Sequence, residues 1–99
     1  MTASVDQLAA SLTALASGIE ARQPDASLLA LLAKTQALCE CAGASEGSAA
    51  RKQRLAQVRT ATETWHTVWP RLGGQRDFRL AVAREARLWS KRITSAAQK

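Results

Sequence analysis

The sequence predicts an all-α protein, a four-helix bundle that runs up-down-up-down with short connections. Alanine and leucine supply most of the hydrophobic residues, which make up 46% of the chain, and both residue types favour helix. Apolar residues recur at helical spacing in four stretches. No run alternates with the period of two that a half-buried strand requires. The 99 residues suit a single domain, residues 1–99, with a modest core.

The first half of the chain is predicted to form two helices. The first covers about residues 4–22, and its apolar face consists of Val5, Leu8, Leu12, Leu15 and Ile19. Pro24 ends it, because a proline disfavours helical conformation in the residue before it. The second covers about residues 26–42, with Asp25 or Ser27 as its N-cap and Gly43 as the residue that follows it. Its apolar stripe consists of Leu28, Leu31, Leu32, Thr35, Leu38 and Cys39.

The second half is predicted to form two further helices. The third covers about residues 48–69 and is ended by Pro70 and Gly73-Gly74. Its apolar arc consists of Leu55, Val58, Ala61, Thr62, Trp65, Val68 and Trp69. The fourth covers about residues 76–96 and has the clearest amphipathic pattern of the chain. Phe78, Val82, Ala86, Trp89 and Ile93 fall within an arc of about 80°.

Short connections make successive helices antiparallel, which favours the up-down-up-down bundle. Two open helical hairpins that close only on dimerisation are the alternative architecture. In either case the apolar face of the fourth helix needs a packing surface, because an isolated amphipathic helix is not stable in water.

Charge is distributed unevenly along the chain. Residues 1–49 carry two cations and five anions, 2 − 5 = −3, whereas residues 50–99 carry twelve cations and three anions, 12 − 3 = +9. All four aromatic residues also lie in the second half. This asymmetry indicates an acidic partner: a protein, a nucleic acid or an anionic membrane surface.

The residues that carry chemistry do not indicate an enzyme. His66 is the only histidine, and with Cys39 and Cys41 it cannot supply a metal site at recognisable spacing. We therefore predict no catalytic residue, metal, cofactor or small-molecule substrate. Cys39 lies on an apolar stripe, and the two cysteines are too close in sequence to bridge, which indicates reduced thiols in the cytoplasm. The N-terminus lacks the features of a signal peptide, and no apolar run is long enough to span a membrane.

The predicted binding surface lies on the last two helices. Its candidate residues for contacting a partner or an anion are Arg76, Arg79, Leu80, Arg84, Arg87, Lys91, Arg51, Lys52 and Arg59. The cations could form a continuous strip that holds phosphates without reading sequence. Nucleic-acid binding is therefore the alternative function.

Protein binding is the favoured function. Tryptophan and arginine dominate interface hot spots, so we expect that Trp65 or Trp69 is partly exposed as an anchor. Leu80 and Leu88 lie outside the apolar stripe of their helix and suggest a second contact surface, or a homodimer seam. We predict a small cytoplasmic adaptor that binds an acidic or helical segment of a protein partner through its basic C-terminal hairpin. A peripheral membrane helix ranks below both functions.

Overall fold

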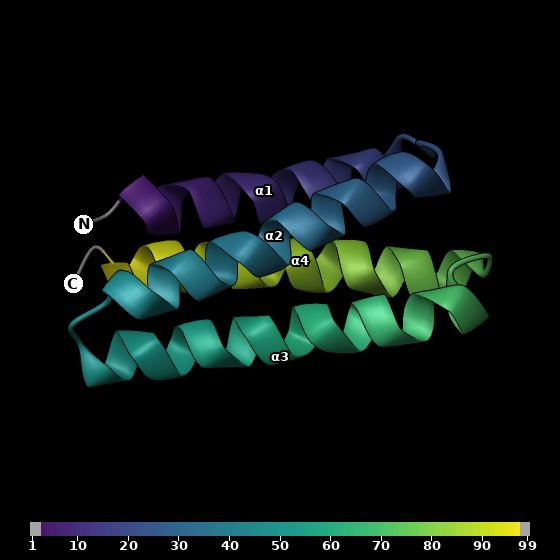
Figure 1. Ribbon diagram of the computed structural model, residues 1–99. Helices are drawn as coiled ribbons and strands as arrows, with labels where there is room; N and C mark the ends of the chain where they lie inside the picture. The colour runs from purple at the N-terminus through teal and green to yellow at the C-terminus, as the bar shows by residue number, and fades with distance from the viewer. Residues whose placement is uncertain (1–2, 98–99) are drawn as a thin grey trace.

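The computed structural model describes residues 3–97, without the side chains of residues 3, 4, 45 and 95–97. Four helices make up this part of the chain (Figure 1): α1 (Ala3–Glu20), α2 (Asp25–Ser45), α3 (Ala49–Leu72) and α4 (Arg76–Ala97). The connections span residues 21–24, 46–48 and 73–75. The predicted all-α bundle with short connections is confirmed.

The helices lie side by side in a ring. Each helix packs on its neighbours in sequence, and α1 also packs closely on α4. The backbones of diagonally opposed helices, α1 with α3 and α2 with α4, do not come close to each other over the described residues. A helix as long as α3 is about 36 Å long, which matches the 38 Å long axis of the molecule. The closure of α1 on α4 within one chain excludes the alternative of two open hairpins.

The core follows from the spacing of the apolar residues. In each of the first three helices, one row of buried residues alternates in steps of three and four, as knobs-into-holes packing requires. These sets are Val5, Leu8, Leu12, Leu15 and Ile19; Leu28, Leu32, Thr35, Cys39 and Ala42; Leu55, Val58, Thr62, Trp65 and Trp69. In α4 the buried residues are Val82, Ala83, Ala86 and Ile93, whereas Phe78 and Trp89 are only partly buried. Three residues of the predicted arc are thus buried, and the core face of α4 extends beyond that arc to Ala83.

The middle of the core contains buried hydroxyl groups. Thr35 donates a hydrogen bond of 2.7 Å to the carbonyl of Leu31. Its oxygen lies 2.7 Å from the hydroxyl of Ser11 on α1. Because Thr35 has only one hydroxyl hydrogen, Ser11 must be the donor of this second bond. Thr62 on α3 is also fully buried and donates to the carbonyl of Arg59 at 2.8 Å.

The predicted end of the third helix at Trp69 is wrong. Pro70 lies inside α3, which continues to Leu72. A proline in the last turn removes only one backbone hydrogen bond, and the N–H of Gly73 closes this turn on the carbonyl of Trp69 at 2.7 Å. The predicted turn residues Gly73 and Gly74 do follow the helix.

Two other predicted boundaries also move. The first helix ends at Glu20 rather than near residue 22, because Arg22 adopts a left-handed conformation with φ of 58°. The second helix continues through Gly43 to Ser45. Asp25 is its first residue and not its N-cap, a position that Pro24 occupies without a side-chain hydrogen bond.

Candidate partner-binding surface

The outer face of α4 is set by the residues that the helix buries. Val82, Ala83, Ala86 and Ile93 face the other helices, so the opposite side of α4 points to solvent. That side carries Asp77, Leu80, Arg84, Leu88 and Lys91, all of them exposed. We call these five residues the outer face of α4.

Two leucines are the unusual feature of this face. Leu80 is 43% exposed and Leu88 is 44% exposed. No other large hydrophobic side chain is exposed in the part of the chain whose side chains are described. Arg84 lies one helical turn from each of them, so apolar and cationic groups alternate along the helix.

Several predicted site arginines are bound within the molecule. Arg87 pairs with Glu20 of α1, and Arg79 pairs with Asp25 of α2. The guanidinium of Arg79 also donates to the carbonyl of Gly73. These contacts join α4 to the first hairpin of the chain. The charges of Arg79 and Arg87 are therefore compensated within the chain, whereas the sequence predicts that both arginines are available to a partner.

The ion pair of Arg87 also changes how both groups titrate. The hydrogen bond from Arg87 lowers the pKa of the Glu20 carboxyl below its ordinary value. Glu20 in turn raises the pKa of Arg87, chiefly through the same hydrogen bond. Both side chains are nearly half exposed, so the pair serves mainly to orient them.

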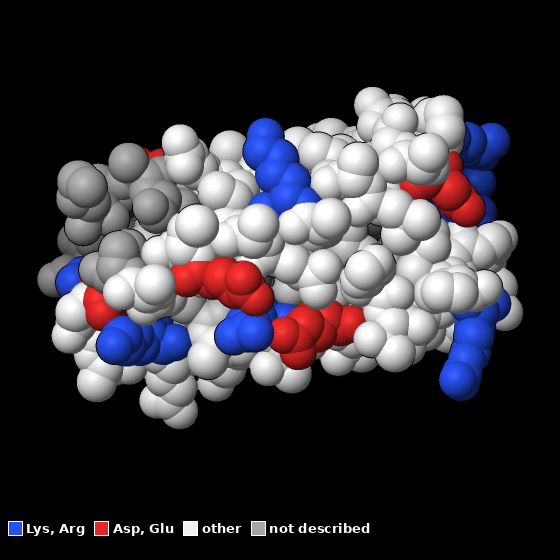
Figure 2. Space-filling model, in the orientation of Figure 1, with Lys and Arg blue, Asp and Glu red and all other residues white. Residues whose placement is uncertain are grey.

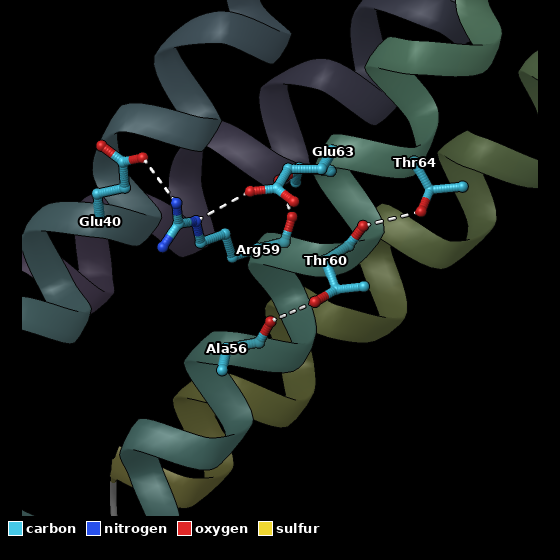
Figure 3. Close-up of polar contacts among 7 residues, drawn as sticks. Glu40, Ala56, Arg59, Thr60, Glu63 and Thr64 are labelled. Atoms are coloured by element: carbon cyan, nitrogen blue, oxygen red, sulfur yellow. Dashed lines mark hydrogen bonds and ion pairs between the residues drawn. The ribbon is translucent and has the colours of Figure 1, made fainter.

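Arg59 bridges α2 and α3 (Figure 3). Its guanidinium lies 3.2 Å from Glu40 and 3.0 Å from Glu63, one on each side. Figure 2 shows the face over these two helices, where red and blue side chains adjoin and most of the surface is uncharged. Arg59 is therefore a poor candidate for binding an external anion.

Cations in the first turns of α3 oppose the helix dipole, and Glu46 compensates for one of them. Its carboxylate lies 3.0 Å from the guanidinium of Arg51 and accepts a hydrogen bond of 3.0 Å from the N–H of Ser48. That N–H, followed by Arg51, lowers the pKa of Glu46 below its ordinary value. Arg51 is thus held by the loop before its own helix.

The remaining predicted cations are not joined into one strip. Arg76, Arg84, Lys91 and Lys52 pair with no carboxylate among the described side chains. Lys52, however, lines a groove of about 570 Å³ between α2 and α3, together with Arg59. Because α2 lies diagonally opposite α4, this groove and the outer face of α4 are on different sides of the bundle. Lys52 and Arg59 therefore do not continue the outer face of α4, as the predicted strip along both helices would require.

The expectation of an exposed tryptophan anchor at Trp65 or Trp69 is also wrong. Each is 4% exposed. Trp65 donates a hydrogen bond of 3.1 Å from its indole N–H to Glu85. Trp69 packs edge-on against Phe78, with ring centroids 5.5 Å apart. Both positions continue the steps of three and four in α3, which explains why they are buried.

A groove that the sequence did not reveal lies where the α1–α2 and α3–α4 turns meet. It has a volume of about 300 Å³. It is lined by Ile19, Glu20, Arg22, Gly74, Arg76, Arg79 and Leu80. No sequence motif marks it, because its walls come from two turns that are far apart in the chain. Through Leu80 it adjoins the outer face of α4.

The groups with chemical reactivity lie apart from this surface. Burial raises the pKa of the Cys39 thiol to about 11, so it remains protonated at neutral pH. His66 and Cys41 are exposed on α3 and α2. Over the side chains described between residues 5 and 94, no three His, Cys, Asp or Glu residues gather closely enough to hold a metal ion.

None of the helices described between residues 3 and 97 has the apolar length that crossing a membrane requires.

Comparison with known proteins adds no relative to this picture. No protein-family model matches the chain, and neither a curated protein nor a solved structure is significantly similar to it.

Proposed function

We propose that the chain is a small, non-enzymatic cytoplasmic protein-interaction module. It docks a helical segment of a protein partner on the outer face of α4. The observation that carries this proposal is the pair of half-exposed leucines, Leu80 and Leu88, on either side of Arg84. Apolar groups with an interleaved cation suit an amphipathic helix that has acidic residues beside its apolar stripe.

The same pattern disfavours the alternative, nucleic-acid binding. Binding of a phosphate backbone depends on clustered cations, and two leucines in the centre of the contact would not contribute to it. Arg51, Arg59, Arg79 and Arg87 are held by carboxylates of the chain itself. The cations that remain are divided between different sides of the bundle. These four arginines therefore contribute little free charge to a site for a polyanion.

Binding assays on two probes separate these functions. The purified chain is titrated against a labelled acidic amphipathic peptide and against a random-sequence DNA duplex, each over a salt series. Replacing Leu80 and Leu88 together by serine should weaken peptide binding roughly 30-fold, because each leucine contributes about 1 kcal/mol when its exposed half is buried. Replacing Arg84 by alanine should also weaken it.

The matched control for Arg84→Ala is Arg71→Ala. Arg71 is exposed in the last turn of α3 and pairs with no carboxylate among the described side chains. It should leave peptide affinity unchanged. Duplex binding with a log–log salt slope of several units, unaffected by the leucine changes, would instead favour the nucleic-acid function.

A further inference from the structure

The outer face of α4 is symmetric about Arg84. Leu80 and Leu88 lie four residues before and after it, and Asp77 and Lys91 lie seven residues before and after it. At a helical advance of about 100° per residue, all five fall within an arc of about 80°. The two leucines are thus equidistant from Arg84, and so are the two outer charges, which have opposite sign.

This symmetry leads us to propose that a second copy of the same chain is a partner of this face. The two α4 helices lie antiparallel, with the two-fold axis passing between the two Arg84 residues. The inference rests on the proposed function, since it takes the outer face of α4 to be a protein-binding surface. The helix that docks on this surface is then α4 of the second copy.

An antiparallel pair places leucine beside leucine and Asp77 beside the oppositely charged Lys91. Leu80 lies about 6 Å from the two-fold axis, measured along the helix, at the level of the partner's Leu88. Asp77 lies about 10.5 Å from the axis, at the level of the partner's Lys91. Each of these contacts occurs twice. Four leucines that are 43–44% exposed in one chain thereby cover one another.

The charges fix the direction of the pairing. Asp77 and Lys91 pair with no opposite charge among the described side chains. Both therefore remain available to a partner. A parallel pair in register would place each beside its own copy, which is repulsive. The antiparallel arrangement converts two repulsions into two ion pairs.

Arg84 opposes the pairing and keeps it weak. On the two-fold axis its guanidinium faces that of the partner. A contact through one helix from each chain also falls below the roughly 1,200 Å² that a stable specific interface buries. We therefore expect a dimer that forms only at high protein concentration, with its affinity limited by Arg84.

Sedimentation equilibrium of the full chain tests the proposal. The wild type should dimerise at concentrations of roughly 100 µM, which corresponds to a weak, small interface. Asp77→Lys and Lys91→Asp should each lower the association constant at least about tenfold, since each replaces two attractions with two repulsions. The double variant, which restores both ion pairs in reversed orientation, should recover it. Arg84→Ala should raise it by about tenfold.

The matched control is Asp6→Lys, which reverses an exposed charge on α1 and should not change association. Helicity measured by circular dichroism shows that each variant is folded. A wild-type chain that stays monomeric up to millimolar concentration overturns the proposal. Failure of the double variant to recover association overturns it as well.

The two proposals fail in different ways. Arg84→Ala should strengthen self-association but weaken binding of the acidic peptide. The association constant of the chain and its affinity for the peptide should therefore change in opposite directions. A monomeric chain that still binds the peptide overturns the self-pairing and leaves the proposed function intact. A dimeric chain that does not bind the peptide supports the self-pairing and overturns the docking of other partners.

Discussion

Replacement of Gly73 by alanine tests whether the α3–α4 turn depends on close contact with Trp69. A Cβ atom at position 73 would lie 2.5 Å from both Cδ1 and Nε1 of the indole ring. It would also lie 2.6 Å from the carbonyl oxygen of Trp69. The ring is 4% exposed and packs against Phe78, so it cannot swing aside. The substitution must therefore displace either the tryptophan or the end of α3.

The expected loss of stability is about 2 kcal/mol, in the middle of the range for an overpacked site. The backbone of Gly73 is ordinary right-handed helix, with φ of −62° and ψ of −20°, so conformational strain adds nothing to this loss. For a chain of this size the loss corresponds to a decrease of roughly 10 °C in melting temperature. Thermal and urea denaturation followed by far-ultraviolet circular dichroism measure both quantities.

Gly74→Ala is the matched control. Nothing lies within 4 Å of a Cβ at Gly74, and its φ is not positive, so alanine there should be neutral or slightly stabilising. Adding Trp69→Phe to Gly73→Ala shortens the ring and should recover about 1 kcal/mol of the loss beyond additivity. Equal stability of the Gly73→Ala and Gly74→Ala variants would refute the steric reasoning.

Three other predictions concern the core and its charges. Thr35→Val should lower the free energy of unfolding, measured by urea denaturation, by about 1–2 kcal/mol, because the buried hydroxyl of Ser11 loses its acceptor. Adding Ser11→Ala should restore part of this stability. A double variant whose loss equals the sum of the two single losses would contradict the explanation. The free energy of unfolding of the wild type should fall relative to Cys39→Ala as pH rises from 9, the ordinary thiol value, to about 11, because only the unfolded thiol ionises in that interval. Parallel curves would show that Cys39 does not titrate differently on folding. Arg59→Ala should cost less than about 1 kcal/mol in denaturation at low salt, since its ion pairs are exposed, and a larger loss would mean that it has a packing role.

Much of the fold was predictable because it depends on periodicity. Steps of three and four residues placed Leu8, Leu32 and Val58 in the core without any knowledge of the tertiary structure. The same spacing places Trp65 and Trp69 in the buried row of α3. The expectation that one of them is exposed came instead from the general abundance of tryptophan at interfaces, which says nothing about a particular position.

The candidate site was less predictable, because ion pairing depends on how the hairpins dock. Arg79 and Asp25 are 54 residues apart, and Arg87 and Glu20 are 67 residues apart. The sequence shows that the two halves have opposite charge, but not which arginines meet a carboxylate. The leucines were recognisable, since Leu80 falls outside the apolar arc in any helical projection.

The ion pairs between the hairpins have a consequence for how the chain assembles. Acidic residues of the first hairpin, such as Glu20 and Asp25, meet arginines of the second, and each hairpin carries an excess of one sign. Two copies of the same hairpin would repel each other, whereas unlike hairpins attract before their apolar faces touch. The charge difference between the halves thus directs each hairpin to its complement as the protein folds, and selects against mispaired hairpins in a crowded solution of identical chains.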